Sequence, residues 1–250
     1  MNFIDPSAEL KQGVTIGYFS VIGKNVKLGE NVIVGNSVTI WPGTIIGDNV
    51  QVGDGCVIGK QPKPSKTSTV KYDKALPPLV IGNNTTVGAN SVLYAGSIIG
   101  EDALIADLAS VREKCTIGNY VVVGRGVAVE NSTTIGDYTK IQTGAYITAY
   151  MEIEDHVFIA PMVTFTNDNF MGRTQERFKY IKGATVKRGA RVGGGVIVLP
   201  GINIAEETFV AAGALVTRDT LPRKVIKGLP AKLVSDVPNK ELLENQEGKK

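Results

Sequence analysis

Polar side chains that could carry chemistry recur at intervals of 18 residues in the middle of this chain. Arg112 and Glu130 form one such pair, Glu113 and Asn131 form another, and Asp107 lies shortly before them. A carboxylate can accept a proton from a reacting group, and a carboxamide can donate hydrogen bonds to a developing negative charge. The same spacing also allows ion pairs with a purely structural role, which typically contribute about 0–1 kcal/mol at a surface.

The elements that position these side chains follow a repeat of six residues. Large apolar residues, the anchors, occupy every sixth position from Ile4 to Ile58, from Ile81 to Phe165 and from Val186 to Val216. Because only 43% of the chain is hydrophobic, chance does not explain an unbroken register. A fixed short period of this kind is typical of a solenoid.

Each unit is interpreted as one short strand and one corner. The residue two positions before many anchors is small or β-branched, as at Thr85 and Ala109, so two side chains per unit point inward. Glycine often follows the anchor, as at Gly82 and Gly118, and we expect it because the corner needs a conformation without a Cβ penalty. Three units close a triangular coil, which predicts an all-β parallel β-helix over residues 1–238 with roughly ten coils about 4.8 Å apart. The charged tail, residues 239–250, is expected to be a short helix or disordered.

The repeat is interrupted twice, by residues 59–80 and by residues 166–185. Loops of about 20 residues in a compact fold usually have a function. Counting in steps of 18 from Leu93 places the start of both loops at the same edge of the prism. Along this edge the corner glycine is replaced by other residues: Trp41, Tyr94, Arg112, Glu130, Thr148 and Thr166, followed by Ala95, Glu113, Asn131, Ala149 and Asn167. The sequence therefore predicts a functional site on this edge, beneath the two loops.

Composition and charge narrow the class of protein. The chain has 250 residues, 20% of them charged, and no apolar run of about 18 residues that could span a membrane. A net charge of +3 is too small to argue for nucleic-acid binding, and the start lacks the features of a secretory signal. Cys56 and Cys115 both fall in the small inward position, which predicts inert core residues and no disulfide framework. We therefore expect a cytoplasmic protein.

The C-terminal repeats resemble those of a known superfamily. After the second loop the chain reads VKRGARVGGGVIVLPGINIAEETFVAAGALVTRDTLPRKVIKGLPAKLV, with a GGG-x-x-x-LPG run and a G-x-PAK exit. Together with the [LIV]-G-x-x-[STAV]-x repeat, this run resembles the hexapeptide-repeat acyltransferase superfamily. The resemblance implies left-handed coiling, a homotrimer, and acetyl-CoA or another acyl-CoA bound in a groove between the last coils of adjacent subunits.

The resemblance also implies which positions hold the cofactor. Small corner residues would let backbone groups hold the pantetheine amides, and basic residues near the exit would meet the phosphates as charge-assisted donors. With the edge residues of the second loop, the expected cofactor-binding set is Ala160, Thr166, Asn167, Lys187, Gly193, Ala211, Gly213, Arg218 and Lys232. The basic members could equally belong to an ordinary solvated surface.

Three further segments look like the nucleotide-sugar N-acyltransferases, which acylate 3-amino or 4-amino deoxysugars linked to dTDP or UDP. They are IADLASVRE (105–113), VGRGVAVENSTTIG (123–136) and FTNDNFMGRTQERF (165–178). The resemblance implies a substrate site that includes Tyr94, Arg112 and Glu130, with Lys66 of the basic first loop near the diphosphate. A merely solvated first loop is the alternative.

The chemistry implied by this resemblance is direct attack of a free sugar amine on the thioester. Asp107 or Glu113 would orient the amine or relay its proton, and Asn131 or a backbone amide would stabilise the oxyanion. Many relatives that act on hydroxyls use a histidine base, but the single histidine, His156, falls on a different edge and is expected to be a surface turn residue. One histidine also excludes a three-histidine zinc site, so no metal is expected. An O-acetyltransferase, an acyltransferase on another acceptor and a non-catalytic scaffold remain alternatives.

Overall fold

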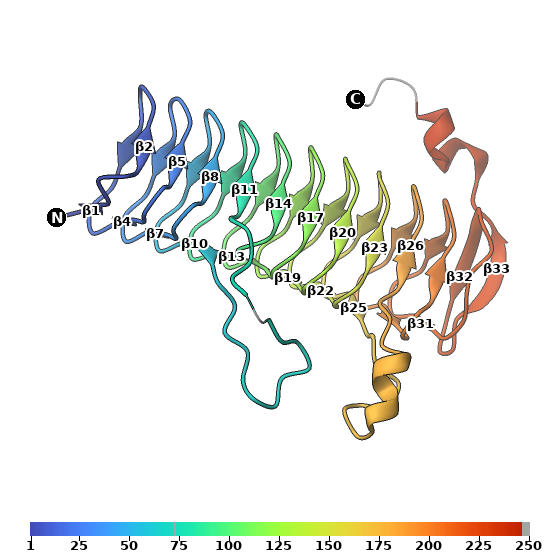
Figure 1. Cartoon of the computed structure of the whole chain (residues 1–250). Coiled ribbons are helices and arrows are strands. Elements are labelled where there is room, and N and C mark those ends of the chain that lie inside the picture. The colour runs from blue at the N-terminus through green and yellow to red at the C-terminus, as the bar shows by residue number, and fades with distance from the viewer. Residues whose placement is uncertain (73, 247–250) are drawn as a thin grey trace.

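The computed structural model describes residues 1–72 and 74–246, and it confirms the all-β repeat architecture (Figure 1). Short strands stack into three sheets, here called A, B and C, and from β1 to β31 consecutive strands along the chain fall in consecutive sheets. Sheet A has 11 strands, sheet B has 10 and sheet C has 12, in agreement with roughly ten coils. The fold is a parallel β-helix, consistent with the left-handed coiling that the resemblance implies.

The strands of each sheet follow one another along the long axis in chain order. Sheet A contains β1 (Phe3–Ile4), β4 (Val21–Ile22), β7 (Thr39–Ile40), β10 (Val57–Lys60), β13 (Val92–Tyr94), β16 (Ser110–Val111), β19 (Ala128–Val129), β22 (Tyr146–Ile147), β25 (Thr164–Phe165), β28 (Ile197–Val198) and β31 (Leu215–Val216). Sheet B contains β2 (Glu9–Leu10), β5 (Lys27–Leu28), β8 (Ile45–Ile46), β11 (Val80–Ile81), β14 (Ile98–Ile99), β17 (Thr116–Ile117), β20 (Thr134–Ile135), β23 (Glu152–Ile153), β26 (Thr185–Val186) and β29 (Asn203–Ile204). Sheet C contains β3 (Thr15–Ile16), β6 (Ile33–Val34), β9 (Gln51–Val52), β12 (Thr86–Val87), β15 (Leu104–Ile105), β18 (Val122–Val123), β21 (Lys140–Ile141), β24 (Phe158–Ile159), β27 (Arg191–Val192), β30 (Phe209–Val210), β32 (Lys224–Lys227) and β33 (Lys232–Asp236).

The core is a column of anchors and small residues inside the prism. From Ile22 to Val216 every anchor is buried, and the residue two positions earlier is buried with it. Both cysteines belong to this column, as predicted, and burial raises the pKa of Cys115 to about 12. Only the first coils are open, where Ile4 and Leu10 remain partly exposed.

Glycine follows many anchors for a different reason from the one we expected. The left-handed backbone falls two residues later in the unit, at Asn84 and Tyr120, each with a φ of 56°. Gly82 and Gly118 have ordinary φ values, but a Cβ on Gly82 would lie 2.7 Å from the carbonyl carbon of Gly100 in the next coil. Glycine is therefore favoured by the close approach of successive coils.

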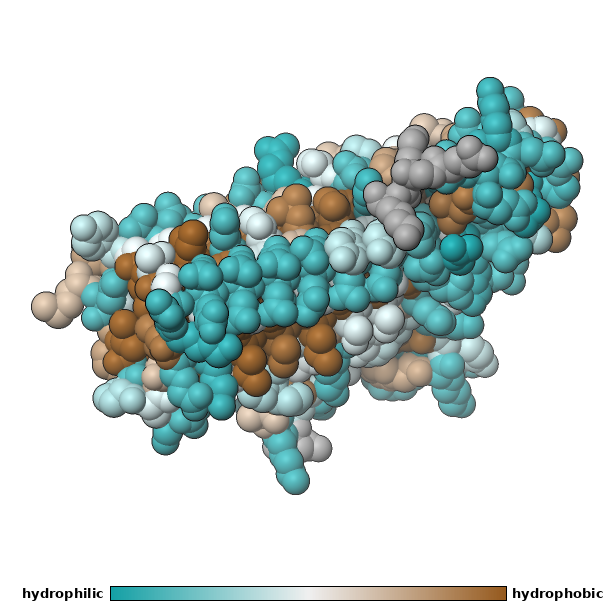
Figure 2. Space-filling model, turned by 90° about the horizontal axis from the view of Figure 1, so that it is seen from above, coloured by the Kyte–Doolittle hydropathy of each residue, from teal (hydrophilic) through white to brown (hydrophobic). Residues whose placement is uncertain are grey.

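Both long loops leave sheet A and return to sheet B, which confirms that they share one edge. The first loop joins β10 to β11, and the second joins β25 to β26 and contains a short 3-10 helix, η1 (Gln175–Lys179). Figure 1 shows both loops projecting from the same side of the prism. We call the A-to-B edge the loop corner, and the B-to-C edge, which no long loop interrupts, the ladder corner. Seen from the side opposite the loops, the surface carries a hydrophilic stripe along the long axis with hydrophobic residues beside it (Figure 2).

The C-terminal end departs from the repeat. Strands β32 and β33 form an antiparallel hairpin, which the sequence pattern did not predict. Two 3-10 turns follow, η2 (Asn239–Glu241) and η3 (Leu243–Asn245), and Leu242 is buried against the prism. These turns fall within residues 239–250, predicted to be a short helix or disordered, of which residues 247–250 lie outside the described part. A helix with the length and apolar character needed to span a bilayer is absent from the described residues.

Candidate functional site

A cleft of about 370 Å³ lies on the loop corner, between the two long loops. Asn131, Ala149 and Asn167, each two residues after an anchor of sheet A, form its floor together with Tyr150. The walls come from the two loops: Thr69 and Val70 from the first, and Asp168, Arg177, Phe178 and Ile181 from the second. The predicted edge therefore forms a concave site that both loops complete.

The second loop brings a charged pair to this cleft. Arg177 Nη1 lies 3.2 Å from Asp168 Oδ2, and its Nε is buried without a hydrogen-bond partner among the described residues. Asp168 also accepts the backbone N–H groups of Phe170 and Gly172, at 2.8 and 3.0 Å. Burial raises the pKa of Asp168, but these hydrogen bonds and Arg177 outweigh it, so the pKa lies below its ordinary value. The pair thus fixes the start of the loop and presents one guanidinium to the cleft.

Asn131, the predicted oxyanion donor, is well placed in the cleft floor. Its side chain is 5% exposed, and its Nδ2 has only a long contact of 3.4 Å, to Ser132 Oγ. Asn167 is similar, with Nδ2 3.4 Å from the carbonyl oxygen of Ala149. Both amides can therefore turn their hydrogen bonds towards a ligand.

Glu113, predicted to orient the amine or relay its proton, is completely buried beside the cleft. The residue is 0% exposed, and Arg112 donates Nε to its Oε2 and Nη2 to its Oε1, both at 2.8 Å. Tyr72 from the first loop donates its hydroxyl to Oε1 at 2.9 Å. Burial alone would raise the pKa of Glu113. The hydrogen bonds from Arg112 and Tyr72 outweigh burial, so the pKa lies below its ordinary value. A fully occupied carboxylate with a lowered pKa is a poor proton acceptor.

The three predicted substrate residues Tyr94, Arg112 and Glu130 do lie together, next to Glu113. Arg112 Nη1 is 3.4 Å from Glu130 Oε2, so the ion pair suggested by the 18-residue spacing is present. The Arg112 guanidinium lies 5.2 Å from the centre of the Tyr94 ring, and Lys60 Nζ approaches the same ring at 5.6 Å. Burial and the neighbouring Glu113 raise the pKa of Glu130, although Arg112 lowers it. Lys66, by contrast, is exposed on the first loop and does not line the cleft.

Asp107 lies on the third corner, between sheets C and A, apart from Glu113. Its Oδ1 accepts the backbone N–H of Ala89 in the previous coil at 2.8 Å. Asp48, Asp54 and Asp137 likewise accept the backbone N–H of the residue 18 positions earlier. The role of Asp107 in the structure is that of a repeated coil-to-coil acceptor, and no ion pair to Arg125 forms.

The predicted cofactor residues fall into separate places. Ala160, Gly193 and Ala211 form a column along the C-to-A corner, where Gly213 adopts a φ of 69° and nothing lies within 4 Å of the place a Cβ would take. Thr166 donates its hydroxyl to the carbonyl oxygen of Val198 at 2.9 Å on the loop corner. Lys187 lies on the ladder corner, where Glu154 Oε1 already pairs with its amino group at 2.7 Å.

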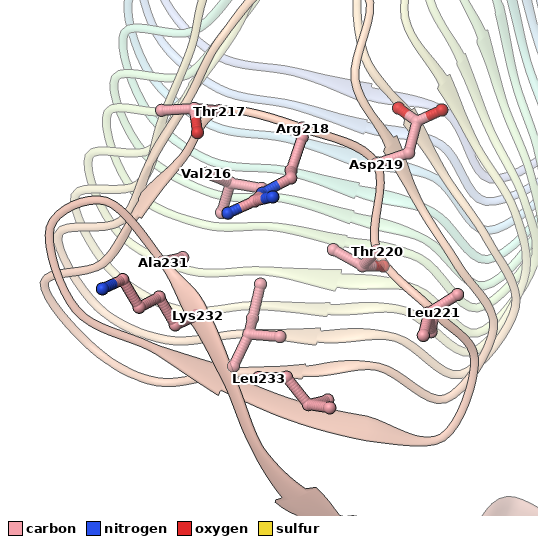
Figure 3. Close-up of a pocket in the computed structure, with 10 residues that line it drawn as sticks. Val216, Thr217, Arg218, Asp219, Thr220, Leu221, Ala231, Lys232 and Leu233 are labelled. Atoms are coloured by element: carbon pink, nitrogen blue, oxygen red, sulfur yellow. The ribbon is translucent and has the colours of Figure 1, made fainter.

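Arg218 and Lys232 both line a cleft of about 280 Å³ at the C-terminal end of the prism. Its apolar lining includes Val216, Leu221 and Leu233. Figure 3 shows Arg218 extending across the end of the coils, while the Lys232 side chain points outward. This cleft joins two of the predicted basic residues but none of the small corner residues.

His156 takes the place expected of a surface turn residue. It has a φ of 58° on the ladder corner, and its ring is tilted against that of Tyr138 with the ring centres 4.9 Å apart. Its Nδ1 lies 2.7 Å from Asp155 Oδ2. Among the described residues, no group of three His, Cys, Asp or Glu side chains could hold a metal ion.

Several residues of the site were missed in the sequence, among them Tyr72 and Arg177. Both lie within the long loops, in stretches without periodicity, so no register places their side chains. Their residue types were the only available signal, since an aromatic or a guanidinium in a long loop often has a partner.

Comparison with known proteins agrees with the repeat. The model of the bacterial transferase hexapeptide (six repeats) matches residues 7–40, 78–113 and 114–149. A putative acetyltransferase of Saccharomyces cerevisiae is 28% identical over 130 residues, which are 51% of this chain and 61% of that protein. The galactoside O-acetyltransferase of Escherichia coli is 26% identical over 128 residues, 50% of this chain and 58% of that protein. The chain thus spans about three fifths of the length of these relatives.

The solved structure of a UDP-N-acetylglucosamine acyltransferase from Francisella novicida has the same fold. Its TM-score is 0.54 at 20% identity, over 98% of this chain and 72% of that one. Over part of its length the chain is thus similar to the hexapeptide transferase model and to these acetyltransferases, and it shares its fold with this acyltransferase.

Proposed function

We propose that the protein is an enzyme that transfers an acetyl or larger acyl group from coenzyme A to the amine of a nucleotide-linked sugar. The acceptor would be a 3- or 4-amino deoxysugar on dTDP or UDP, used in the cytoplasm by a homotrimer. The observation that carries the proposal is the cleft between the two long loops, with carboxamides in its floor and one guanidinium in its wall. Such a mixture suits a sugar that carries a charged diphosphate better than an apolar ligand.

The residues of the cleft support amine attack without a dedicated base. The nitrogen of the free amine would form a bond to the thioester carbon, the carbon–sulfur bond would break, and the departing thiolate would finally take the proton. Asn131 would donate to the oxyanion, because its Nδ2 has no close partner. Glu113 has no free oxygen for this proton, so positioning of the amine would supply most of the acceleration.

The binding of acyl-CoA is proposed on the C-to-A corner and the C-terminal end. The column of Ala160, Gly193 and Ala211 carries no large side chain, and the open space around Gly213 would fit a closely approaching ligand. Arg218 and Lys232 could meet phosphates there as charge-assisted donors.

The test is a thiol-release assay with acetyl-CoA and a panel of dTDP- and UDP-linked 3-amino and 4-amino sugars. We expect release with at least one amine and none with the matching hydroxyl sugar. Release with hydroxyl sugars or with a free galactoside would instead favour an O-acetyltransferase, the second candidate, which the similarity to the E. coli enzyme supports. Coenzyme A binding without release by any amine would favour a longer acyl donor, and no binding at all would favour a scaffold.

A further inference from the structure

The first loop is closed on itself at its stem, and its returning arm is held to the prism. At the stem, Gln61 Nε2 donates to the carbonyl oxygen of Leu76 and its Oε1 accepts the Leu76 N–H, both at 2.9 Å. On the returning arm, the Tyr72 hydroxyl donates to Glu113 Oε1 at 2.9 Å, and Lys114 Nζ lies 4.8 Å from the centre of the Tyr72 ring. Between these two points lie Thr69 and Val70, which wall the cleft.

Groups of the prism orient the Glu113 carboxylate that accepts the hydrogen bond from Tyr72. Arg112 holds both of its carboxylate oxygens, and Glu130 in the next coil steadies Arg112. The carboxylate is therefore ionised and held in place by groups of the prism itself. Burial and the contact with Glu113 raise the pKa of Tyr72, so its hydroxyl keeps its proton and donates it in a hydrogen bond.

We propose that Glu113 is a positioning residue that, oriented by Arg112, holds the first loop over the loop corner through Tyr72 and so shapes the acceptor cleft. A hydrogen bond to a buried carboxylate is among the stronger contacts a loop can make, because the acceptor cannot turn to water instead. The role in the acceptor cleft rests on the proposed function, but the attachment of the loop does not.

The test compares Tyr72→Phe with wild type and with Tyr138→Phe, a matched control on the ladder corner. Limited trypsin digestion of the full chain reports on the loop directly, since Lys66 and Lys71 are exposed within it. We expect Tyr72→Phe to be cleaved at these lysines about tenfold faster, with the thermal midpoint of the whole protein unchanged. Cleavage at the wild-type rate would overturn the proposal.

A kinetic reading then tests the link to the cleft. With an accepted amino sugar, we expect Tyr72→Phe to raise KM for the acceptor several-fold, with kcat and KM for acetyl-CoA kept. Faster cleavage with an unchanged acceptor KM would overturn the claim that this contact shapes the cleft. Faster cleavage in a protein that uses no amine at all would support the loop contact while overturning the proposed function.

Discussion

The loop corner and the ladder corner are built from the same six-residue unit, yet they use it differently. On the ladder corner, glycine follows the anchor and the next residue is an acceptor such as Asp137, which takes the backbone N–H of Asn119 in the previous coil. The side chains of Asn31, Asn49 and Asn84 then form a ladder with contacts of 3.2 Å. The polar groups of this corner largely satisfy one another.

On the loop corner the same positions carry larger or charged residues and are covered by the loops. Glu113 there is buried under Arg112 and Tyr72. Glu101, at the same position of the ladder corner, is exposed, and its carboxylate accepts a hydrogen bond from Asn83. The repeats thus stabilise the prism where a corner keeps the regular order of glycine and acceptor. The loop corner, which lacks this order, can instead form a site. Three pairs of variants and one single variant can break or sharpen this comparison.

The largest contrast is expected between Glu113→Gln and Glu101→Gln. The first weakens hydrogen bonds to a buried carboxylate and should lower the free energy of unfolding by about 1.5–3 kcal/mol at neutral pH. The second should change it by less than about 0.5 kcal/mol, because its site is exposed. Urea unfolding of both variants measures the difference.

The pH dependence of the Glu113 effect has a defined sign. Since the pKa of Glu113 is lowered in the native state, its contribution is present above the pKa of the unfolded chain and is lost as pH falls through the native pKa. Wild type and Glu113→Gln should therefore converge in acid. A constant gap from neutral to acidic pH would show that packing, and not the charge, accounts for the loss.

The second contrast concerns the coil spacing. Gly118→Val would place a Cβ 2.3 Å from Asp137 Oδ1, so it should cost about 1–3 kcal/mol by overpacking. Thr148→Val, at the same repeat position of the loop corner, adds no atom near the next coil and removes only the buried hydroxyl, so it should cost about 0.5–1.5 kcal/mol. Equal losses in thermal unfolding would mean that the two corners are equally tight.

The third contrast separates a coil contact from a catalytic group. Asp107→Ala removes the acceptor for the Ala89 N–H, which water can replace, so we expect a loss of about 0.5–1 kcal/mol. Asp107→Asn keeps an oxygen there and should restore the stability. Turnover should match wild type in both variants. Lost turnover in Asp107→Asn at full stability would return Asp107 to the reaction.

The fold and the site edge were predictable because both depend on counting. Two inward side chains per six residues specify the prism, and positions 18 apart share a column, so the two loops were assigned to one corner. The same count separates Asp107 from Glu113, since Ile105 and Val111 anchor different sheets. Counting alone therefore predicts that Asp107 and Glu113 lie on different corners and cannot both act on one amine.

What counting cannot give is the conformation of the loops. Tyr72 meets Glu113 across 41 residues, and Arg177 meets Asp168 through an irregular turn, so both contacts depend on tertiary packing. The terminal hairpin is equally invisible, because β32 and β33 carry no six-residue register. The glycine positions were recognisable, but their reason needed the distance between coils.

The smallest expected effect concerns Glu130, and its sign is opposite to that of Glu113. Because burial and Glu113 raise the native pKa of Glu130, its contribution is present below the pKa of the unfolded chain and is lost as pH rises through the native pKa. Glu130→Gln should therefore be more stable than wild type at neutral pH, by up to about 1 kcal/mol since the side chain is partly exposed, and equal to it in acid. Unfolding curves across this pH range measure the difference. A variant less stable than wild type at neutral pH would mean that the contact with Arg112 outweighs burial, and that Glu130 supports the loop corner instead of straining it.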